Sequence, residues 1–262
     1  RAALETVRLR DRSVPYVGVI AGDNTVALGT LSGRRPPGAA AVQRIARLRS
    51  LAFVVHRRPG PRRASLPVTS ARSEDLDGVI DFLHAYGPRH QLFPVVEREE
   101  LLDGRSYRGL QPGDLLMAWR DGSLAGVLGS WDQSAYKQEM LADLGPRLRR
   151  WRPAYDLLAR TIGARPLPRP GEPIRSAFGC LRCVVDDDPD VLATLLRAAR
   201  ARARQQGQAF LLVGFDGGEP LAQTLGRPLA VPYESEVFMG AFPGEALLPL
   251  DERPVHVEVG TL

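Results

Sequence analysis

The sequence has little lysine, few cysteines and no long apolar run. Of its 35 Lys and Arg residues, only Lys137 is a lysine. No apolar run approaches the roughly 18 to 20 residues that a membrane-spanning helix needs, and the first residues show neither a signal-peptide core nor an initiator methionine. These absences predict a cytoplasmic protein without a membrane partner, with further residues upstream of Arg1.

Charge and known catalytic motifs exclude several classes of protein. The net charge of +5 is spread thinly along the chain, and no nucleic-acid-binding motif accompanies it. The preference for arginine is typical of a GC-rich bacterial genome, so we do not expect a nucleic-acid partner. The sequence contains no His-Glu-x-x-His, Gly-x-Ser-x-Gly or P-loop motif, which disfavours metalloproteases, serine hydrolases and nucleoside triphosphatases.

The two cysteines, Cys180 and Cys183, form a Cys-x-x-Cys pattern inside a segment typical of a buried strand. Residues three apart on a regular strand point to opposite faces, so these thiols should not share a metal ion. We therefore expect two buried structural thiols and no metal site.

The first part of the chain alternates helix and strand patterns and ends in a linker. Residues 1–13 have helical spacing, 14–21 form an apolar run typical of a buried strand, 25–33 predict a short helix and 46–58 a further strand. Proline and arginine then dominate residues 58–67, which indicates a linker. We predict one structural unit over residues 1–57 and a second over 68–262.

The second unit is longer and contains an irregular stretch that we interpret as an insertion at about 133–173. Asp121-Gly122 joins two apolar runs and predicts a hairpin. The other predicted elements are a strand at 68–71, helices at 73–87 and 93–102, a strand at 176–185, a helix at 188–207, a strand at 208–216, a short helix at 219–226 and strands at 234–242 and 254–260.

One pattern occurs twice, roughly 190 residues apart. Ser13–Val19 and Gly207–Val213 each follow a helical segment and precede a short helix that contains leucine. Such self-similarity predicts a duplication. The alternative is that any two junctions between a helix and a strand look alike.

The order of elements in the second unit resembles the GNAT (GCN5-related) N-acetyltransferase superfamily. Residues 1–57 resemble the back half of another such unit, and Asn24 and Ala27 match the family's Asn-x-x-Ala after the fifth strand. The resemblance implies an α/β fold with a mixed sheet, in two units of which the first is incomplete. Leu31 stands where the family has its tyrosine acid, so another proton donor must serve.

The resemblance also implies acetyl-CoA or another acyl-CoA as co-substrate. In the family the fourth and fifth strands, here at 176–185 and 208–216, splay apart, and a helix crosses between them. The pantetheine arm lies along the free edge of the fourth strand, which here implies Cys183, Val184 and Val185, and the pyrophosphate lies at the next helix N-terminus. The sequence there has no glycine, but four aspartates: Asp186, Asp187, Asp188 and Asp190. Asp188 is placed to cap the next helix, with Pro189 at its first position. Carboxylates repel phosphates, so we expect that the second unit does not bind coenzyme A in the usual way.

Three residues are candidates for the chemistry. Acyl transfer to an amine needs a base for the ammonium proton and an acid for the leaving thiolate. Tyr233 and Glu234 could form an acid and base pair, and His90 follows the helix that shapes the family's acceptor site. Each of these residues also has a purely structural interpretation, as a surface histidine or as ordinary strand residues.

The sequence thus predicts an N-acyltransferase for a small-molecule or peptide amine. The alternatives are a non-catalytic ligand-binding or structural module, and an arginine-rich nucleic-acid binder. The sequence leaves a homodimer open.

Overall fold

The structure is a computed structural model that describes residues 16–32, 40–57, 66–103, 106–225, 229–242 and 245–262. The helix expected at 1–13 and most of the expected linker lie outside these residues. Within the described part of the chain, no helix is long and apolar enough to cross a membrane.

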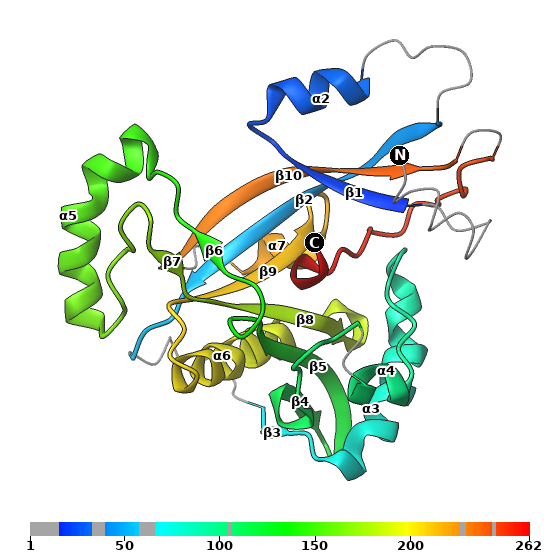
Figure 1. Ribbon diagram of the computed structural model, residues 1–262. Coiled ribbons are helices and arrows are strands. Elements are labelled where there is room, and N and C mark those ends of the chain that lie inside the picture. Colours follow the sequence, from blue (N-terminus) through cyan, green and yellow to red (C-terminus); the bar gives the residue numbers. More distant parts are fainter. Residues whose placement is uncertain (1–15, 33–39, 58–65, 104–105, 226–228, 243–244) are drawn as a thin grey trace.

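An eight-stranded mixed sheet organises the protein (Figure 1). In spatial order its strands are β1 (Tyr16–Ala21), β10 (Ala230–Gly240), β2 (Val42–Val54), β9 (Phe210–Asp216), β8 (Ser176–Val184), β5 (Ser123–Asp132), β4 (Leu115–Arg120) and β3 (Val68–Ser70). All neighbours are antiparallel except β8 and β9, which are parallel. The sheet confirms the predicted α/β class.

Helices cover both faces of this sheet. The helices that the structure describes are α2 (Thr25–Ser32), α3 (Leu76–Tyr86), α4 (Arg98–Asp103), α5 (Gly145–Ile162), α6 (Pro189–Gln205) and α7 (Pro220–Thr224), of which α6 and α3 pack on opposite faces of the sheet. The two strands of a small second sheet, β6 (Glu139–Met140) and β7 (Pro173–Ile174), flank α5 in the sequence. Helix α5 and these two strands lie beside the main sheet (Figure 1), within the range 133–173 that we predicted to be an insertion.

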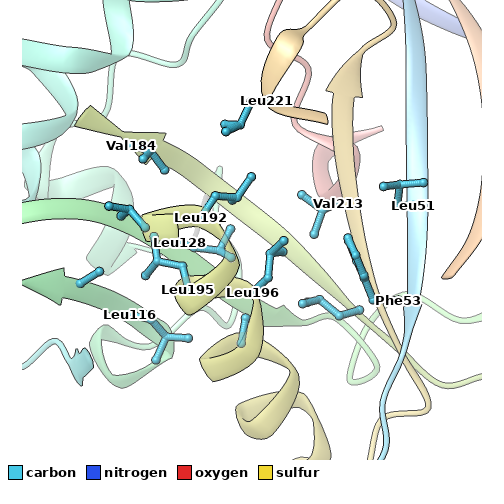
Figure 2. Packing of buried hydrophobic residues seen from close by; sticks show 14 of the residues in the cluster. Leu51, Phe53, Leu116, Leu128, Val184, Leu192, Leu195, Leu196, Val213 and Leu221 are labelled. Atoms are coloured by element: carbon cyan, nitrogen blue, oxygen red, sulfur yellow. The ribbon is translucent and has the colours of Figure 1, made fainter. Parts of the chain in front are cut away.

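The largest hydrophobic cluster lies between α6 and the sheet. Leu192, Leu195 and Leu196 lie on one side of α6 because they are spaced at three and four residues. Figure 2 shows these side chains facing Leu128 of β5 and Val184 of β8. A second cluster joins α3 to the opposite face of the sheet. Two segregated cores thus fix β8 between helices on both sides.

Local signals in the sequence predicted several elements correctly. Asp121 and Gly122 both have positive φ, 49° and 78°, as a tight hairpin turn between β4 and β5 requires. Asp188 precedes α6, and its side chain accepts hydrogen bonds from the backbone amides of Asp190 and Val191. Pro189 occupies the first turn, where its missing N–H costs nothing.

The parallel strands β8 and β9 pair over only three residue pairs and then diverge. The pairs are Ser176–Phe210, Ala177–Leu211 and Phe178–Leu212, while β8 continues to Val184 and β9 to Asp216. Helix α6 connects the two strands and packs on the sheet, as predicted. The divergence leaves a notch between the second halves of β8 and β9, which we call the β8–β9 notch.

The first strands of the chain lie in the same sheet as the last ones. The segments β1–α2–β2 and β9–α7–β10 have the same order of strand, short helix and long strand. Each long strand pairs with the other segment's first strand: β10 with β1, and β2 with β9, while β2 and β10 pair at the centre. Of the predicted strand at 14–21, residues 16–21 lie in β1, and 14–15 lie outside the described residues.

Two predictions about strands were wrong. Residues 254–260 do not form a strand; they make one bridge, Gln91 to Val255, and end in a 3-10 turn at Val259–Thr261. Neighbouring strands already occupy both sides of β10, and β9 is open only in the notch. Cys180 and Cys183 do not face opposite sides but pack in one hydrophobic cluster, because β8 has a bulge at Leu181, whose φ is 51°.

Helix prediction also failed in part at residues 93–102. Only Arg98–Asp103 is helical, and residues 93–97 have no regular secondary structure. The residue before a proline avoids the helical conformation, so Pro94 keeps Phe93 out of the helix.

Candidate functional site

The β8–β9 notch contains a buried ion pair. The bulge at Leu181 turns the next side chain, Arg182, toward β9, where its guanidinium lies 4.6 Å from the centre of the Phe215 ring. Arg182 donates two hydrogen bonds to Glu219, the residue that precedes α7, at 2.6 and 2.8 Å. Both side chains are almost fully buried, with exposed fractions of 4% and 1%. The pair therefore bridges the two diverging strands.

This ion pair sets the protonation of Glu219. Burial alone raises the pKa of a carboxyl group, but the charge of Arg182, the nearby His90 and the hydrogen bonds from Arg182 together outweigh it and lower the pKa of Glu219 to about 2. Glu219 is thus a carboxylate at neutral pH. A buried carboxylate held by two hydrogen bonds is a structural anchor and a poor general base, because its affinity for a proton is low.

His90 lies beside this pair and is itself buried. Its Nε2 atom is 3.7 Å from Glu219 Oε1 and 4.0 Å from Asp187 Oδ1, and no group lies within hydrogen-bond distance of it. The predicted surface histidine is therefore a buried residue of the notch. The three side chains come from three places in the chain: the end of α3, the loop before α6 and the corner after β9.

Residues 254–262, which we call the tail segment, fill the rest of the notch. The Glu258 carboxylate accepts a hydrogen bond from the Leu181 amide at 2.8 Å. The same carboxylate lies 2.6 Å from His256 Nε2, within hydrogen-bond distance. Asp216 Oδ2 accepts from the Val255 amide. The tail segment thus occupies a backbone donor on the free edge of β8.

The backbone donors at the start of α6 are occupied as well. Asp188 Oδ1 accepts from the amides of Asp190 and Val191 at 2.8 and 3.2 Å, and Asp188 also pairs with Arg120. Although partial burial raises the pKa of Asp188, these hydrogen bonds lower it on balance. An anion would have to displace this carboxylate. The expected role of Asp188 as a helix cap is confirmed.

The residues predicted to bind a cofactor do not lie together. Asn24 caps α2 by accepting a hydrogen bond from the Ala27 amide at 3.1 Å. Cys183 and Val184 end β8, and Val185 begins the following turn. Strands β10, β2 and β9 separate β1 from β8 in the sheet, so these residues belong to two corners of the molecule. Burial raises the pKa of Cys183 to about 12, so its thiol stays protonated.

Tyr233 lines a cavity on the face of the sheet opposite α6. This cavity has a volume of about 470 Å³ and includes Ser50, Phe178, Leu212 and Ser235 in its lining. Partial burial and the nearby Asp23 raise the pKa of Tyr233, so its hydroxyl keeps its proton at neutral pH. A protonated tyrosine in a cavity is suited to donate a proton.

Glu234 does not share this cavity with Tyr233. Successive residues of a regular strand point to opposite faces, and Glu234 does not line the cavity. Its backbone carbonyl accepts a hydrogen bond from the Gly22 amide. His90 lines a different cavity, so the three catalytic candidates lie in three separate surroundings.

Sequence reasoning missed four residues of the notch: Arg182, Glu219, His256 and Glu258. One signal could have found Glu219. The stretch Glu219-Pro-Leu-Ala222 has the same spacing after β9 as Asn24-Thr-Val-Ala27 has after β1. No such signal relates Arg182 to His256 and Glu258, because they lie far apart in the sequence: 77 positions separate Leu181, the neighbour of Arg182, from Glu258.

Solved structures show what this fold is similar to, although no family model matches the sequence and no curated protein matches it. A GCN5-related N-acetyltransferase from Sphaerobacter thermophilus has a TM-score of 0.56 at 12% identity, covering 93% of this chain and 66% of that chain. A GNAT-family acetyltransferase from Colwellia psychrerythraea has a TM-score of 0.47 at 12% identity, covering 87% and 65%. The chain thus spans slightly less than two thirds of both proteins.

The Sphaerobacter structure establishes the fold, since the likeness extends over nearly the whole of this chain. The protein has the fold of the GCN5-related N-acetyltransferases.

Proposed function

We propose that the protein is an acyl-CoA-dependent N-acyltransferase that acts on a small-molecule or peptide amine. The cavity at Tyr233 carries the proposal, because it places a protonated hydroxyl beside β1, where we expect the acyl donor to bind. The likeness to a GCN5-related N-acetyltransferase supports the same reaction class. We infer a cytoplasmic enzyme, in line with the sequence.

The proposal includes two related units. The exchange of β2 and β10 between the segments β1–α2–β2 and β9–α7–β10 supports a duplication. We assign residues 1–57 to the first unit and 68–262 to the second, joined at 58–67. Because β2 lies between β9 and β10, the second unit completes its sheet with a strand of the first.

We propose that the β8–β9 notch does not hold the acyl donor. The tail segment occupies the Leu181 amide, the Arg182–Glu219 pair bridges the strands, and Asp188 takes the amides at the start of α6. A bound acyl-CoA therefore belongs to the first unit, next to β1 and the corner at Asn24. Acetyl-CoA is the simplest donor of this kind.

In the proposed reaction the neutral amine nitrogen attacks the thioester carbonyl, a C–N bond forms and the C–S bond breaks. The amine loses one proton and the leaving thiolate gains one. Tyr233 is our candidate for the acid, because its cavity contains Val19 and Ala21 of β1 and its hydroxyl is protonated. It would replace the acid that Leu31 cannot supply.

Thiol release by the complete chain tests this function. The protein is mixed with acetyl-CoA and a panel of primary amines, and free coenzyme A is followed with a thiol-reactive dye while mass spectrometry identifies the amide. We expect turnover with at least one amine and a loss of about 10²-fold or more in kcat for Tyr233→Phe. Tyr136→Phe, which changes an exposed tyrosine outside the cavity, is the matched control.

The second candidate is a non-catalytic ligand-binding module. The closed β8–β9 notch favours it, because the family's donor position is filled by the protein's own side chains. Absence of thiol release with every amine, together with retention of an amine ligand, would support this module over the enzyme.

A further inference from the structure

One buried histidine faces two carboxylates across distances that are too long for hydrogen bonds. His90 is 8% exposed, and its Nε2 lies 3.7 Å from Glu219 Oε1 and 4.0 Å from Asp187 Oδ1. Among the residues that the structure describes, this nitrogen has no hydrogen-bond partner. Because it is destabilising to leave a buried polar atom unpaired, its direction toward the two oxygens indicates a ligand between the three atoms.

The separations fit a small cation that is bound to all three atoms. With metal–ligand bonds of about 2.1 Å, two ligand atoms lie about 3.4 Å apart at a tetrahedral angle and at most about 4.2 Å apart. Both separations from His90 fall within this range, and all three ligand atoms lie within 4.8 Å of one another. The Asp187 side chain is 43% exposed, so it has space to move toward the ion.

The fold brings the three ligands together from separate elements. His90 follows α3, Asp187 ends the turn between β8 and α6, and Glu219 precedes α7. Arg182 holds the Glu219 carboxylate in place with two hydrogen bonds. Carboxylates that bind metal ions are commonly oriented by such hydrogen bonds. The structure therefore fixes the direction of two ligands, His90 and Glu219, and leaves the third on an exposed turn.

Charge and ligand type select the kind of cation. The carboxylates of Asp187 and Glu219 and the guanidinium of Arg182 together carry one negative charge, so a cation is attracted to the cluster. One imidazole with two carboxylates suits zinc and its neighbours among the divalent transition metals. Magnesium and calcium prefer ligands that are all oxygen.

We propose that His90, Asp187 and Glu219 form a binding site for a divalent transition-metal ion such as zinc. Three protein ligands leave a fourth position for water, as in zinc sites that are open to a ligand. His90 also lines a cavity of about 570 Å³, which gives the ion a path from solvent. The bound ion ties the end of α3 to the turn before α6 and to the corner after β9, without using either cysteine.

Calorimetry with zinc chloride on the complete chain, freed of metal by a chelator, tests the site. We expect saturable binding of one zinc ion and a higher unfolding temperature with zinc, because the ion binds the folded protein. Magnesium chloride should bind at least tenfold more weakly. Asp187→Asn and His90→Gln should each weaken zinc binding at least tenfold. Asparagine tolerates the left-handed backbone at position 187, whose φ is 50°, so this variant should keep the turn even if His90→Gln fails to fold.

Two neighbours provide matched controls. Asp186 has φ of 53° and pairs with Arg89 at 2.7 Å, and His84 is an exposed histidine on α3. Asp186→Asn and His84→Gln should each change the affinity for zinc less than twofold. Lack of saturable zinc binding would overturn the site, as would equal weakening by Asp186→Asn and Asp187→Asn, or magnesium binding as tight as that of zinc. Because no acyl-CoA is present, these results do not depend on acyl transfer.

Discussion

The corners after β1 and after β9 share a backbone plan but differ in chemistry. Asn24 and Glu219 each precede a short helix at the same distance from their strands, and Ala27 and Ala222 follow each of them by three positions. Asn24 caps its own helix, whereas Glu219 makes no cap and binds Arg182 of β8. Asn24 acts only on its own helix, whereas Glu219 ties the start of α7 to the neighbouring strand β8. We call the Arg182–Glu219 ion pair the clamp.

The difference explains why the β8–β9 notch is closed. A neutral cap leaves the space beside its strand to other groups, but a buried carboxylate requires a buried cation. Arg182 supplies that cation, and the tail segment covers the remaining edge of β8. The same fold thus contains one corner that is compatible with a ligand and one that is filled by the protein.

Removing the cation of the clamp should have the largest effect. Arg182→Met leaves Glu219 as a buried charge without a partner, so the free energy of unfolding should fall by about 3 to 5 kcal/mol. Urea unfolding followed by circular dichroism measures it. The double variant Arg182→Met, Glu219→Leu should recover most of this loss, and a single variant that loses less than about 1 kcal/mol would contradict the clamp.

A fall in pH should have the second largest effect, because it weakens the clamp. The pKa of Glu219 is about 2 in the folded protein, compared with 4.5 for an unperturbed glutamate. The lowered pKa therefore stabilises the folded protein above pH 4.5. This contribution, about 3 kcal/mol, is lost as the pH falls from 4.5 through 2. Unfolding midpoints measured across this range should fall more steeply for the natural protein than for Glu219→Gln. Parallel curves would show that Glu219 does not titrate in this way.

Substitutions at two glycines compare strand β9 with strand β1. A methyl group at Gly214 of β9 would meet Val259 at 2.5 Å and the Val257 carbonyl at 3.2 Å, whereas one at Gly18 of β1 would meet nothing within 4 Å. Gly214→Ala should therefore cost about 1 to 3 kcal/mol of stability. Gly18→Ala should be neutral or slightly stabilising. Equal effects would mean that the tail segment does not pack against β9.

The cap at Asn24 should show the smallest effect. Asn24→Ala removes the hydrogen bond to the Ala27 amide, so the protein should lose about 1 kcal/mol, with faster hydrogen exchange in α2. Asn24→Asp keeps the acceptor and should retain the stability. A loss as large as that of Arg182→Met would show that the two corners do not differ as described.

Helix caps and tight turns could be predicted from the sequence, because each depends on residues that are neighbours in the chain. The Asp188-Pro189 start of α6 and the Asp121-Gly122 turn are examples, and both formed as expected. The divergent pair β8 and β9 was also predicted, from the resemblance in the order of elements. Each of these signals is short or depends only on sequence order.

The remainder depends on contacts that join distant parts of the chain. Arg182 and Glu219 are 37 positions apart, and no pattern in the sequence relates them. The bulge at Leu181 reversed the expected orientation of Cys183, because one extra residue changes the face of every position after it. Strand β2 was predicted, but its place between β9 and β10 depends on pairing across the whole sheet.

Nuclear magnetic resonance with coenzyme A most directly tests the claim that the β8–β9 notch is closed. The complete chain, labelled with nitrogen-15, is titrated to millimolar coenzyme A while the amides of Leu181, Asp190 and Val191 are observed. We predict that these three amides do not shift, because Glu258 and Asp188 already accept their hydrogen bonds. Saturable shifts at all three amides would contradict the account, since they would place the ligand in the notch that the protein fills itself.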